Sequence, residues 1–332
     1  MSAVRRPSAG DCITRLSDGG YYTAEALAGL FSVSRSTILR FMGELKAAGA
    51  PIASRRGLGY RLTEHLSVLN GDEIYGYLSP LAKLRLGRPT VLLSVDSTNR
   101  YAMARSRRRP VPAAQWFLAE HQSAGRGRRG RRWQSPYGGS LYLSVLWRFP
   151  AMPEEPGMFS PALALACAKS LRALGVADLA LKWPNDILWQ GRKLAGILIE
   201  TRGSPRGNSY LVFGLGLNVA LPRRAGKLID QPWADLSQAL GDRCPSRNLL
   251  AAMMANAAVT VLSGLELGET PAIEAEWPEW DALWGQNVIV EQGGKRHRGR
   301  AQGIDAQGRL LLATEAGIEA FTDGETSLRP ET

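Results

Sequence analysis

The chain has 332 residues, 45% of them hydrophobic and 21% charged, which is typical of a globular protein with room for two or three domains. Three cysteines and three histidines are scattered without metal-ligand or disulfide spacing, which argues against a zinc or iron site and a disulfide framework. No apolar run approaches the ~18 residues of a membrane span and no secretory signal is recognisable, so we expect a cytoplasmic protein without a membrane partner. The net charge of +11 predicts an anionic partner, although a bias towards surface arginine would give the same value.

Residues 11–63 have the pattern of a helix-turn-helix followed by a short hairpin. Thr23 and Ser34 are placed to cap two successive helices, because a hydroxyl just before a helix accepts a hydrogen bond from a free backbone N–H group. Gly49 supplies a stop for the second helix. The apolar side chains expected to face inward are Leu27, Leu30 and Phe31 in the first helix, and Ile38, Phe41 or Met42, and Leu45 in the second.

The second helix and the hairpin carry the candidate DNA-binding residues. A recognition helix meets base edges with its first turn, and arginines of a wing hairpin reach phosphates or the minor groove. The candidates are Arg35, Ser36, Thr37 and Arg40 on the helix and Arg55 and Arg56 on the hairpin. Small three-helix units also serve as protein-docking modules, so this alternative stays open. We expect a winged helix-turn-helix domain over residues 1–66, followed by a short joining helix opened by Asn70 and Glu73.

From residue 91 onward, short apolar strands outnumber the helices and are not regularly separated by them. This pattern favours an α+β domain with a mainly antiparallel sheet over a doubly wound parallel fold. Asp96 or Ser97 is placed to cap a helix that begins near Asn99, and Ser160 to cap a helix over 160–174. The expected strands are 91–95, 116–121, 140–149, LALKW, DILW, KLAGILIET and YLVFGLGLNV.

The most informative segment is GRGRRGRRW at 125–133, in which glycines let the backbone turn tightly and arginines gather guanidinium groups suited to phosphate or carboxylate. It is not a Walker loop, since GxxxxGK[ST] is absent. It fits the dinucleotide-binding fingerprint poorly, since no helix begins there. A nucleic-acid-binding arginine–glycine segment is conceivable, but such segments are usually longer and lie outside folded domains. We therefore expect an anion clamp that is mobile until a ligand orders it.

Three blocks together, GRGRRGRRW at 125–133, KWPNDIL at 182–188 and RKLAGILIE at 192–200, resemble the biotin–protein ligase family. DSTN at 96–99 precedes them and GLGLNV at 214–219 follows them, in the family's order and spacing. The resemblance covers nearly the whole chain and is strongest to the bifunctional type, which is both ligase and biotin-operon repressor. It implies a class II synthetase-like ligase domain with a mixed or antiparallel sheet, here over residues 67–283.

The resemblance further implies ATP and biotin as substrates, Mg²⁺ as a cofactor, and a lysine of a biotin carboxyl carrier protein domain as the acceptor. Such an enzyme holds two anions together and keeps water away from the reactive biotinyl-5′-AMP. The resemblance implies, or the chemistry of the residues allows, contacts to biotin from Ser97, Thr98, Asn99, Gln122, Arg126, Gly127, Arg128 and Lys193. The corresponding adenylate contacts are Arg128, Arg129, Trp133, Lys182, Asn185 and Asn218.

Lys182, Arg128 and Asp186 are the candidates for catalysis. A lysine inside the apolar stretch LALKW is unusual because burying an unpaired charge is costly, although a lysine can also snorkel to the surface. Asp186 is a candidate for Mg²⁺ or for contact with the incoming lysine, but Asn185 and Asp186 are also common in turns for backbone reasons alone. Arg128 is expected to retain the adenylate, and Ser97 both to cap its helix and to contact the ligand.

Residues 246–265 predict a helix capped by Ser246, and four short strands with glycine-containing turns predict an SH3-like β-barrel over 284–332. Two segments receive no individual roles. The first, 221–236, resembles the family's second mobile loop, which folds over the adenine. The second, RSRRRP at 105–110, is expected to be a solvated loop.

Two other functions remain open from the sequence: a transcription regulator that senses a small acid without turnover, and a lipoate–protein ligase. The bifunctional interpretation also predicts that the adenylate promotes homodimerisation through a sheet edge. The two winged helices of such a dimer would span a palindromic operator DNA.

Overall fold

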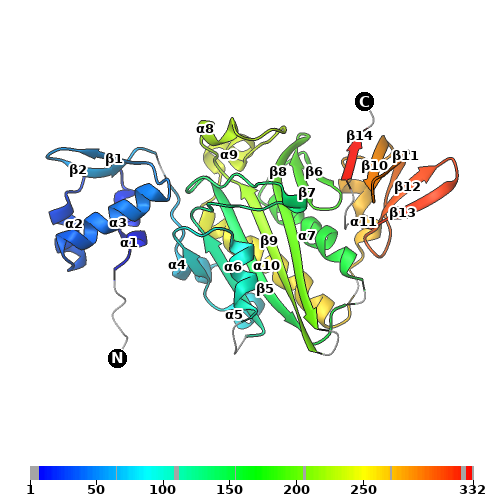
Figure 1. The fold of residues 1–332 in the computed structure, drawn as a ribbon, viewed down its shortest axis with the longest axis horizontal. Helices are drawn as coiled ribbons and strands as arrows, with labels where there is room; N and C mark the ends of the chain where they lie inside the picture. Colours follow the sequence, from blue (N-terminus) through cyan, green and yellow to red (C-terminus); the bar gives the residue numbers. More distant parts are fainter. Residues whose placement is uncertain are drawn as a thin grey trace.

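The structure is a computed structural model that describes residues 7–64, 66–107, 112–153, 155–204, 207–269, 271–322 and 327–330. The chain runs from a helical N-terminal module through a central sheet with helices on its faces to a small C-terminal sheet (Figure 1). The α+β class is therefore confirmed. Within RSRRRP, Arg105 ends a helix and Ser106 is buried, while residues 108–110 lie outside the described residues.

The N-terminal module is a three-helix unit followed by a two-stranded wing. The side chain of Thr23 accepts a hydrogen bond from the N–H of Ala26, and that of Ser34 from the N–H of Thr37, so both predicted caps are confirmed. Leu30 does not face inward as predicted but is 57% exposed, because α2 packs on α3 through the side that carries Leu27. The elements are α1 (Ala9–Leu16), α2 (Ala24–Phe31), α3 (Arg35–Ala47), β1 (Ile52–Arg55) and β2 (Gly59–Leu62).

The central sheet has seven strands in the order β3-β4-β5-β9-β8-β7-β6. Among the strands that the structure describes here, only β3 and β4 pair in parallel, so the prediction of a mainly antiparallel sheet is confirmed. The strands are β3 (Thr90–Leu92), β4 (Ala114–Ala119), β5 (Ser140–Phe149), β6 (Leu179–Lys182), β7 (Asp186–Trp189), β8 (Arg192–Ser204) and β9 (Gly207–Asn218). The helices of this region are α4 (Gly71–Gly76), α5 (Pro80–Leu86), α6 (Thr98–Arg105), α7 (Phe159–Ala173), α8 (Arg223–Gly226), α9 (Leu236–Leu240), α10 (Arg247–Glu266) and α11 (Ile273–Trp280).

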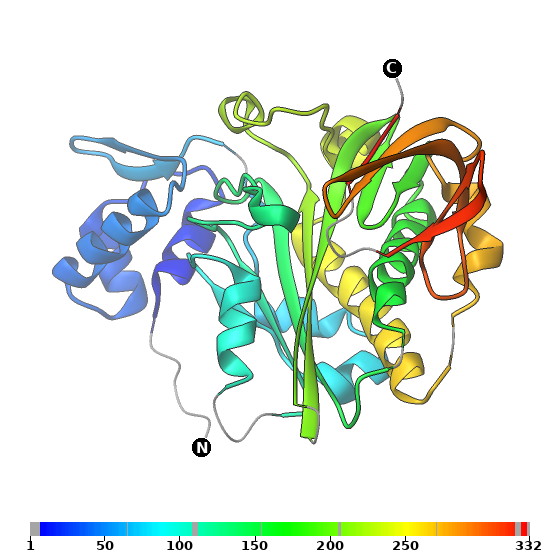
Figure 2. The same cartoon turned by 45° about the vertical axis from the view of Figure 1, so that its right-hand side comes forward.

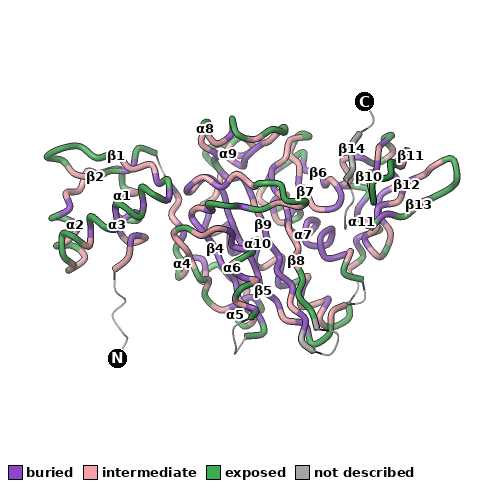
Figure 3. The backbone as a smooth tube through the Cα atoms, in the orientation of Figure 1, coloured by how far each residue is buried: buried purple, intermediate pink, exposed green. Residues whose placement is uncertain are grey.

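The two faces of the sheet pack against different helices. Successive side chains of a strand point to opposite faces, so neighbouring residues of one strand belong to different clusters. On β5, Leu143 and Val145 belong to the main core, which α7 and α10 cover, whereas Leu146 packs with Ala102 of α6 in a small second cluster. Ser144 points to that second face as well and hydrogen-bonds with residues at the start of α6. Figures 2 and 3 show α6 and the paired helices α7 and α10 around the buried strands. The face that carries α6 is therefore the less covered one.

Two expectations about the central helices need correction. Ser160 is not a cap but lies within α7, which begins at Phe159 with Met158 at the N-cap position and no side-chain capping bond. α10 is long and apolar enough by composition to cross a membrane, contrary to the expectation that no such run exists. Its apolar window is 56% buried, and it packs on α7 and β5, as the central helix of a globular core does. The predicted cap of α10 by Ser246 is confirmed.

The C-terminal module is an antiparallel sheet of five strands, one more than predicted, in the order β13-β12-β11-β10-β14. The additional strand, β14, pairs with β10 at the sheet edge. Buried side chains of this sheet join the main core cluster, and Trp183 donates through Nε1 to the carbonyl of Gly308 at 2.9 Å. The strands are β10 (Asn287–Gln292), β11 (Lys295–Ile304), β12 (Leu310–Thr314), β13 (Gly317–Phe321) and β14 (Ser327–Pro330).

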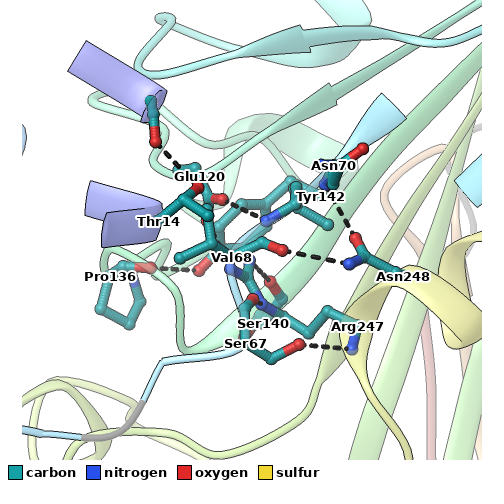
Figure 4. Close-up of polar contacts among 12 residues, drawn as sticks. Thr14, Ser67, Val68, Asn70, Glu120, Pro136, Ser140, Tyr142, Arg247 and Asn248 are labelled. Atoms are coloured by element: carbon teal, nitrogen blue, oxygen red, sulfur yellow. Dashed lines mark hydrogen bonds and ion pairs between the residues drawn. The ribbon is translucent and has the colours of Figure 1, made fainter. Parts of the chain in front are cut away.

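The linker after the wing is held by a buried ion pair (Figure 4). Arg247, at the start of α10, is 1% exposed and pairs with Glu120 at 2.5 Å, while its Nε donates to the carbonyl of Ser67 at 2.8 Å. The second carboxylate oxygen of Glu120 accepts from the N–H of Leu69 at 2.7 Å. Arg247 also donates to the carbonyl of Ser140 at 3.2 Å. The two residues thus join the linker to β4, β5 and α10.

Candidate ligand pocket and DNA-binding surface

A cavity of about 520 Å³ opens on the less covered face of the central sheet. Its walls come from the start of α6, the 125–133 segment, β8, β9 and the 228–233 segment, so residues distant in sequence meet there. Of the predicted site residues, those on its lining are Ser97, Thr98, Asn99, Gln122, Arg126, Gly127, Arg128, Trp133, Asn185, Lys193 and Asn218. Those not on its lining are Lys182, Asp186 and Arg129.

At one end of the cavity, the start of α6 is tied to the segment after β4. The N–H and hydroxyl of Thr98 both donate to Oε1 of Gln122, at 2.8 and 3.1 Å, and Nε2 of Gln122 donates to Ser135 at 3.0 Å. Ser97 occupies the N-cap position but makes no side-chain capping bond, so that part of its expected role is wrong. Ser97 is buried and lines the cavity, which leaves its hydroxyl placed for a ligand.

Glycines of β8 and β9 make room for two larger side chains on the cavity floor. A Cβ on Gly214 would collide with Oδ1 of Asn99, and one on Gly216 would lie 2.5 Å from the indole of Trp133. Gly196 is paired with Gly216 across the strands and also lies under this indole. The alternation in GLGLN therefore has a physical reason: glycines face the cavity while Leu215 and Leu217 face the core.

The glycine–arginine segment 125–133 forms a short hairpin with its own backbone hydrogen bonds. The N–H of Trp133 donates to the carbonyl of Gly125 at 2.9 Å, and the N–H of Gly127 to that of Arg131 at 2.7 Å. Its tip turns through Arg129, which has a left-handed φ of 55° and is exposed. Composition alone did not indicate this hairpin, and ordering of the segment by a ligand stays a prediction.

Two charged or polar contacts lie where the hairpin faces β7 and β8. Arg128 donates through Nη1 to Oδ1 of Asn185 at 3.3 Å, and Nδ2 of Asn185 donates to the carbonyl of Ile197 at 2.7 Å. The ammonium of Lys193 lies 2.7 Å from Asp186, with both side chains mostly buried, and 5.5 Å from the ring of Trp133. Lys193 therefore presents the lysine charge to the cavity, whereas Lys182, at the end of β6, does not line it.

The side chains around Asp186 do not form a ready Mg²⁺ site. Within the part of the chain that the structure describes, no group of three or more Asp, Glu, His or Cys side chains could hold a metal ion. The nearest cation to the Asp186 carboxylate is the ammonium of Lys193, whose positive charge opposes a divalent ion at the same oxygen. The predicted metal role of Asp186 therefore does not fit these contacts, and we derive no step through a protein-held metal.

The 221–236 segment lies against the far end of the cavity. It contains α8, and its residues from Leu228 to Gln231 together with Trp233 line the cavity. Backbone bonds link the segment to β8, because the N–H of Lys193 donates to Pro232 at 2.9 Å and that of Ala234 to Lys193 at 3.0 Å. Asn218 donates to the carbonyl of Ala234 at 2.9 Å. Asn218 thus supports this segment as well as lining the cavity.

Several residues with a part in the site were missed by the sequence analysis. The hydroxyl of Ser144 donates to Oδ1 of Asn99 at 2.6 Å and lies 2.8 Å from the hydroxyl oxygen of Thr98, and Glu200 accepts from Asn99 and Arg126 at 3.0 and 2.8 Å. Ser144 interrupts an apolar strand, which is the available signal, since a buried hydroxyl needs a partner. Glu200 is inconspicuous in sequence, because it ends an apolar run where a solvent-exposed glutamate is expected.

Most of the candidate DNA-binding side chains of the N-terminal module are exposed to solvent. Arg35, Arg40, Arg55 and Arg56 are exposed, Ser36 is exposed and Thr37 is half-buried at the start of α3. Arg35 pairs with Glu25 and Arg40 with Glu44, both at 2.5 Å. Because exposed ion pairs contribute little stability, DNA phosphates can replace these glutamates at small cost.

Family models match three parts of the chain. Residues 91–218 match the biotin/lipoate A/B protein ligase family, residues 284–329 the biotin protein ligase C terminal domain, and residues 12–61 an HTH domain. The first match contains the cavity residues from Ser97 to Asn218. The third contains α2, α3 and the wing. The order of the matched families along the chain thus agrees with the order of the three modules in the structure.

Relatives and solved structures agree with these matches. The chain is 35% identical over 320 residues to the bifunctional ligase/repressor BirA of Escherichia coli (strain K12), covering 96% of each chain. It is 27% identical over 327 residues to BirA of Bacillus subtilis (strain 168), covering 96% of this chain and 98% of that one. A structure of the biotin protein ligase from Aquifex aeolicus in complex with biotin and ATP has a TM-score of 0.60 and 25% identity, covering 74% of this chain and 99% of that one. The fold, the cavity and the near full-length similarity lead to one conclusion: the chain belongs to the biotin–protein ligase family.

Proposed function

We propose that this protein is an ATP-dependent biotin–protein ligase that also binds operator DNA as a repressor. The main support for the ligase function is the cavity, in which the last three residues of DSTN, the glycine–arginine hairpin, Asn185 of WPND, Lys193 and Asn218 meet on one sheet face. The bifunctional relatives of nearly the same length, and the ligase structure bound to biotin and ATP, support this assignment.

The reaction has two steps. A carboxylate oxygen of biotin attacks the α-phosphorus of ATP, so that the bond to pyrophosphate breaks and biotinyl-5′-AMP forms. The amine of an acceptor lysine then attacks the biotinyl carbonyl carbon, AMP leaves with the bond electrons, and the amine loses a proton. No side-chain nucleophile is needed, so the protein's contribution is to orient the two anions, to offset their charge and to exclude water.

The cavity residues divide this work by their position. We assign the ureido ring of biotin to the Ser97, Thr98 and Gln122 end, where hydroxyl and amide groups are held by α6 and β4. Arg128 and Lys193 then lie where the carboxylate and the α-phosphate meet, and cationic donors there stabilise the developing charge. The acceptor is proposed to be the lysine of a biotin carboxyl carrier protein domain.

At the nucleotide end, Trp133 has one side of its indole against Gly216, which leaves the other side for a planar ring. The 228–233 segment would cover that ring. Asn218 supports the segment through Ala234. Mg²⁺ would enter with the ATP phosphates rather than on a site built from these side chains.

The direct test is a transfer assay with purified protein, ATP, labelled biotin and a carrier domain. We expect pyrophosphate release and label on one carrier lysine. Absence of pyrophosphate with both substrates present would leave a ligand-sensing regulator. Displacement of biotin by an equal concentration of lipoate would instead favour a lipoate–protein ligase.

Replacing Arg128 with glycine should release the adenylate from the pocket. Loss of a charge-assisted hydrogen bond weakens binding by about ten- to a hundred-fold, so free biotinyl-5′-AMP should accumulate by that factor and label nearby lysines without selectivity. Arg129→Gly is the matched control, because Arg129 is in the same hairpin but is exposed and does not line the cavity. Equal retention of the adenylate by wild type and Arg128→Gly would contradict the assignment.

Binding of DNA should depend steeply on salt and weaken when the wing arginines are removed. Removing one arginine that neutralises a phosphate should reduce the slope of log affinity against log salt by about 0.9, so Arg55→Ala and Arg56→Ala should each lower it by about that amount. Titration of a fluorescent duplex at several salt concentrations measures the slope. Arg296→Ala, an exposed arginine of β11, serves as the control. A slope unchanged in both wing variants would show that the wing does not meet the backbone.

Three further parts of the proposal concern organisation. We propose domains over residues 1–66, 67–283 and 284–332, a cytoplasmic location, and dimer formation on adenylate binding. The sheet offers an edge for a dimer, because β7 pairs with β8 only as far as Gly196, and β8 continues to Ser204. Ultracentrifugation should show doubled mass with biotinyl-5′-AMP.

A further inference from the structure

A single carboxylate, that of Glu200, connects the cavity floor to the glycine–arginine hairpin. Glu200 lies on β8, two residues beyond Leu198, and therefore on the same face as this cavity-lining residue. Its Oε2 accepts from Nδ2 of Asn99 at 3.0 Å, and its Oε1 accepts from Nη1 of Arg126 at 2.8 Å. The side chain is only 22% exposed, so solvent screens these two contacts incompletely.

The first contact determines the orientation of Asn99. Oδ1 of its amide accepts from Ser144 at 2.6 Å, and Nδ2 donates both to Glu200 and to the carbonyl of Leu198 at 3.2 Å. A carboxylate can only accept, so Glu200 requires the nitrogen of the amide on its side. The amide also lies directly over Gly214, where no side chain would fit beside it. Glu200 and the carbonyl of Leu198 together therefore hold the nitrogen of the amide towards β8 and its oxygen towards Ser144 of β5.

The second contact holds the hairpin against the sheet. Arg126 lies where the two arms of the hairpin meet, bridged through its backbone to Arg132, and its guanidinium reaches Glu200, 74 residues further along the chain. Glycines leave such a hairpin many backbone states when nothing ties it down. An ion pair made before the substrate arrives reduces the conformational entropy that is lost on binding.

We propose that Glu200 is a positioning residue, which docks the 125–133 hairpin on the sheet before any substrate binds, in place of the ligand-dependent ordering expected from the sequence, and which helps to orient the amide of Asn99. The kinetic effect expected of Glu200 rests on the proposed ligase function, whereas the docking of the hairpin by Glu200 does not depend on that function. Glu200 does not line the cavity and so acts through Asn99 and Arg126 rather than on the substrate.

The test compares Glu200→Gln and Glu200→Ala with wild type in the absence of ligand. Hydrogen exchange of the Gly127 and Trp133 amides, which donate the hairpin bonds, should speed up by about tenfold in Glu200→Ala and less in Glu200→Gln, which keeps one acceptor. Glu279→Gln is the control for loss of a glutamate charge from an Arg–Glu pair, since Glu279 forms an exposed ion pair with Arg172, between α7 and α11. It should leave hairpin exchange unchanged.

Kinetics separate positioning from general loss of structure. In the Glu200 variants we expect KM for biotin to rise about tenfold while kcat for pyrophosphate release stays within about twofold, because a misplaced pocket weakens binding of ground and transition states alike. Hairpin exchange at the wild-type rate in Glu200→Ala overturns the proposal, as does a fall in kcat with KM unchanged. If exchange rises but wild-type protein releases no pyrophosphate, docking by Glu200 stands and the ligase assignment fails.

Discussion

Lys193→Met is expected to lower the rate of adenylate formation by about a hundred- to a thousand-fold, the loss typical when one preorganised donor is removed from a developing anion. Lys193 is the lysine that lines the cavity, and its ammonium is mostly buried beside Trp133 and Asp186. In such a water-poor setting its charge is weakly screened and acts strongly on the substrate phosphate. Stopped-flow or coupled measurement of pyrophosphate release gives the rate.

A second explanation for such a loss is an unpaired Asp186. The double variant Lys193→Met/Asp186→Asn removes both charges and so distinguishes the two causes. We expect it to be as slow as Lys193→Met alone, because the missing donor is what matters. Recovery of the rate in the double variant would instead assign the defect to the stranded carboxylate. Lys182→Met should have a much smaller effect, since Lys182 does not line the cavity.

Arg247→Met is expected to lower the free energy of unfolding by about 3–5 kcal/mol, the usual result of removing one partner of a buried ion pair. Arg247 and Glu120 have side chains 1% and 4% exposed, so the Glu120 carboxylate would keep the hydrogen bond from the N–H of Leu69 but would have no cation beside it. The carbonyls of Ser67 and Ser140 would also be deprived of a donor. Urea unfolding measures the change.

The double variant Glu120→Gln/Arg247→Met separates the stranded charge from weakened packing. Glutamine is neutral and can still accept from Leu69, so the double variant should be more stable than Arg247→Met alone. Arg172→Met, which breaks an exposed pair with Glu279, should change stability little because solvent screens that pair. A double variant less stable than the single one would contradict the charge argument.

Local signals in the sequence predicted most of the secondary structure. The caps of α2, α3 and α10 follow from a hydroxyl before an apolar periodic run, and β5 from the long apolar residues over 140–149. These predictions hold because each depends on bonds within a few residues. Ser160 and Leu30 failed for the opposite reason: which residue begins a helix, or which side is covered, depended on the neighbouring elements.

The family motifs named the cavity residues but not their partners. DSTN, WPND and GLGLN reach one face because β4, β5, β9 and β8 are neighbours in the sheet, an order that no single motif contains. Lys182 and Lys193 look equally suitable in sequence, and only the geometry of β6, β7 and β8 separates them. In the sequence Arg129 likewise cannot be distinguished from the neighbouring arginines, and only the turn of the hairpin shows that Arg129 is exposed to solvent.

The winged helix-turn-helix, the α+β class of the central domain, its arginine-rich clamp and the small β module could be predicted from caps, periodicity and short motifs, because these act locally, whereas the ligase assignment came from the resemblance of three motifs to a known family. Tertiary structure alone decided which charges meet. Glu120 and Arg247 are 127 residues apart and Glu200 and Arg126 are 74 apart, yet each pair is in contact. Such contacts are set by strand order and helix packing, whose energies come from many side chains at once rather than from any short stretch of chain.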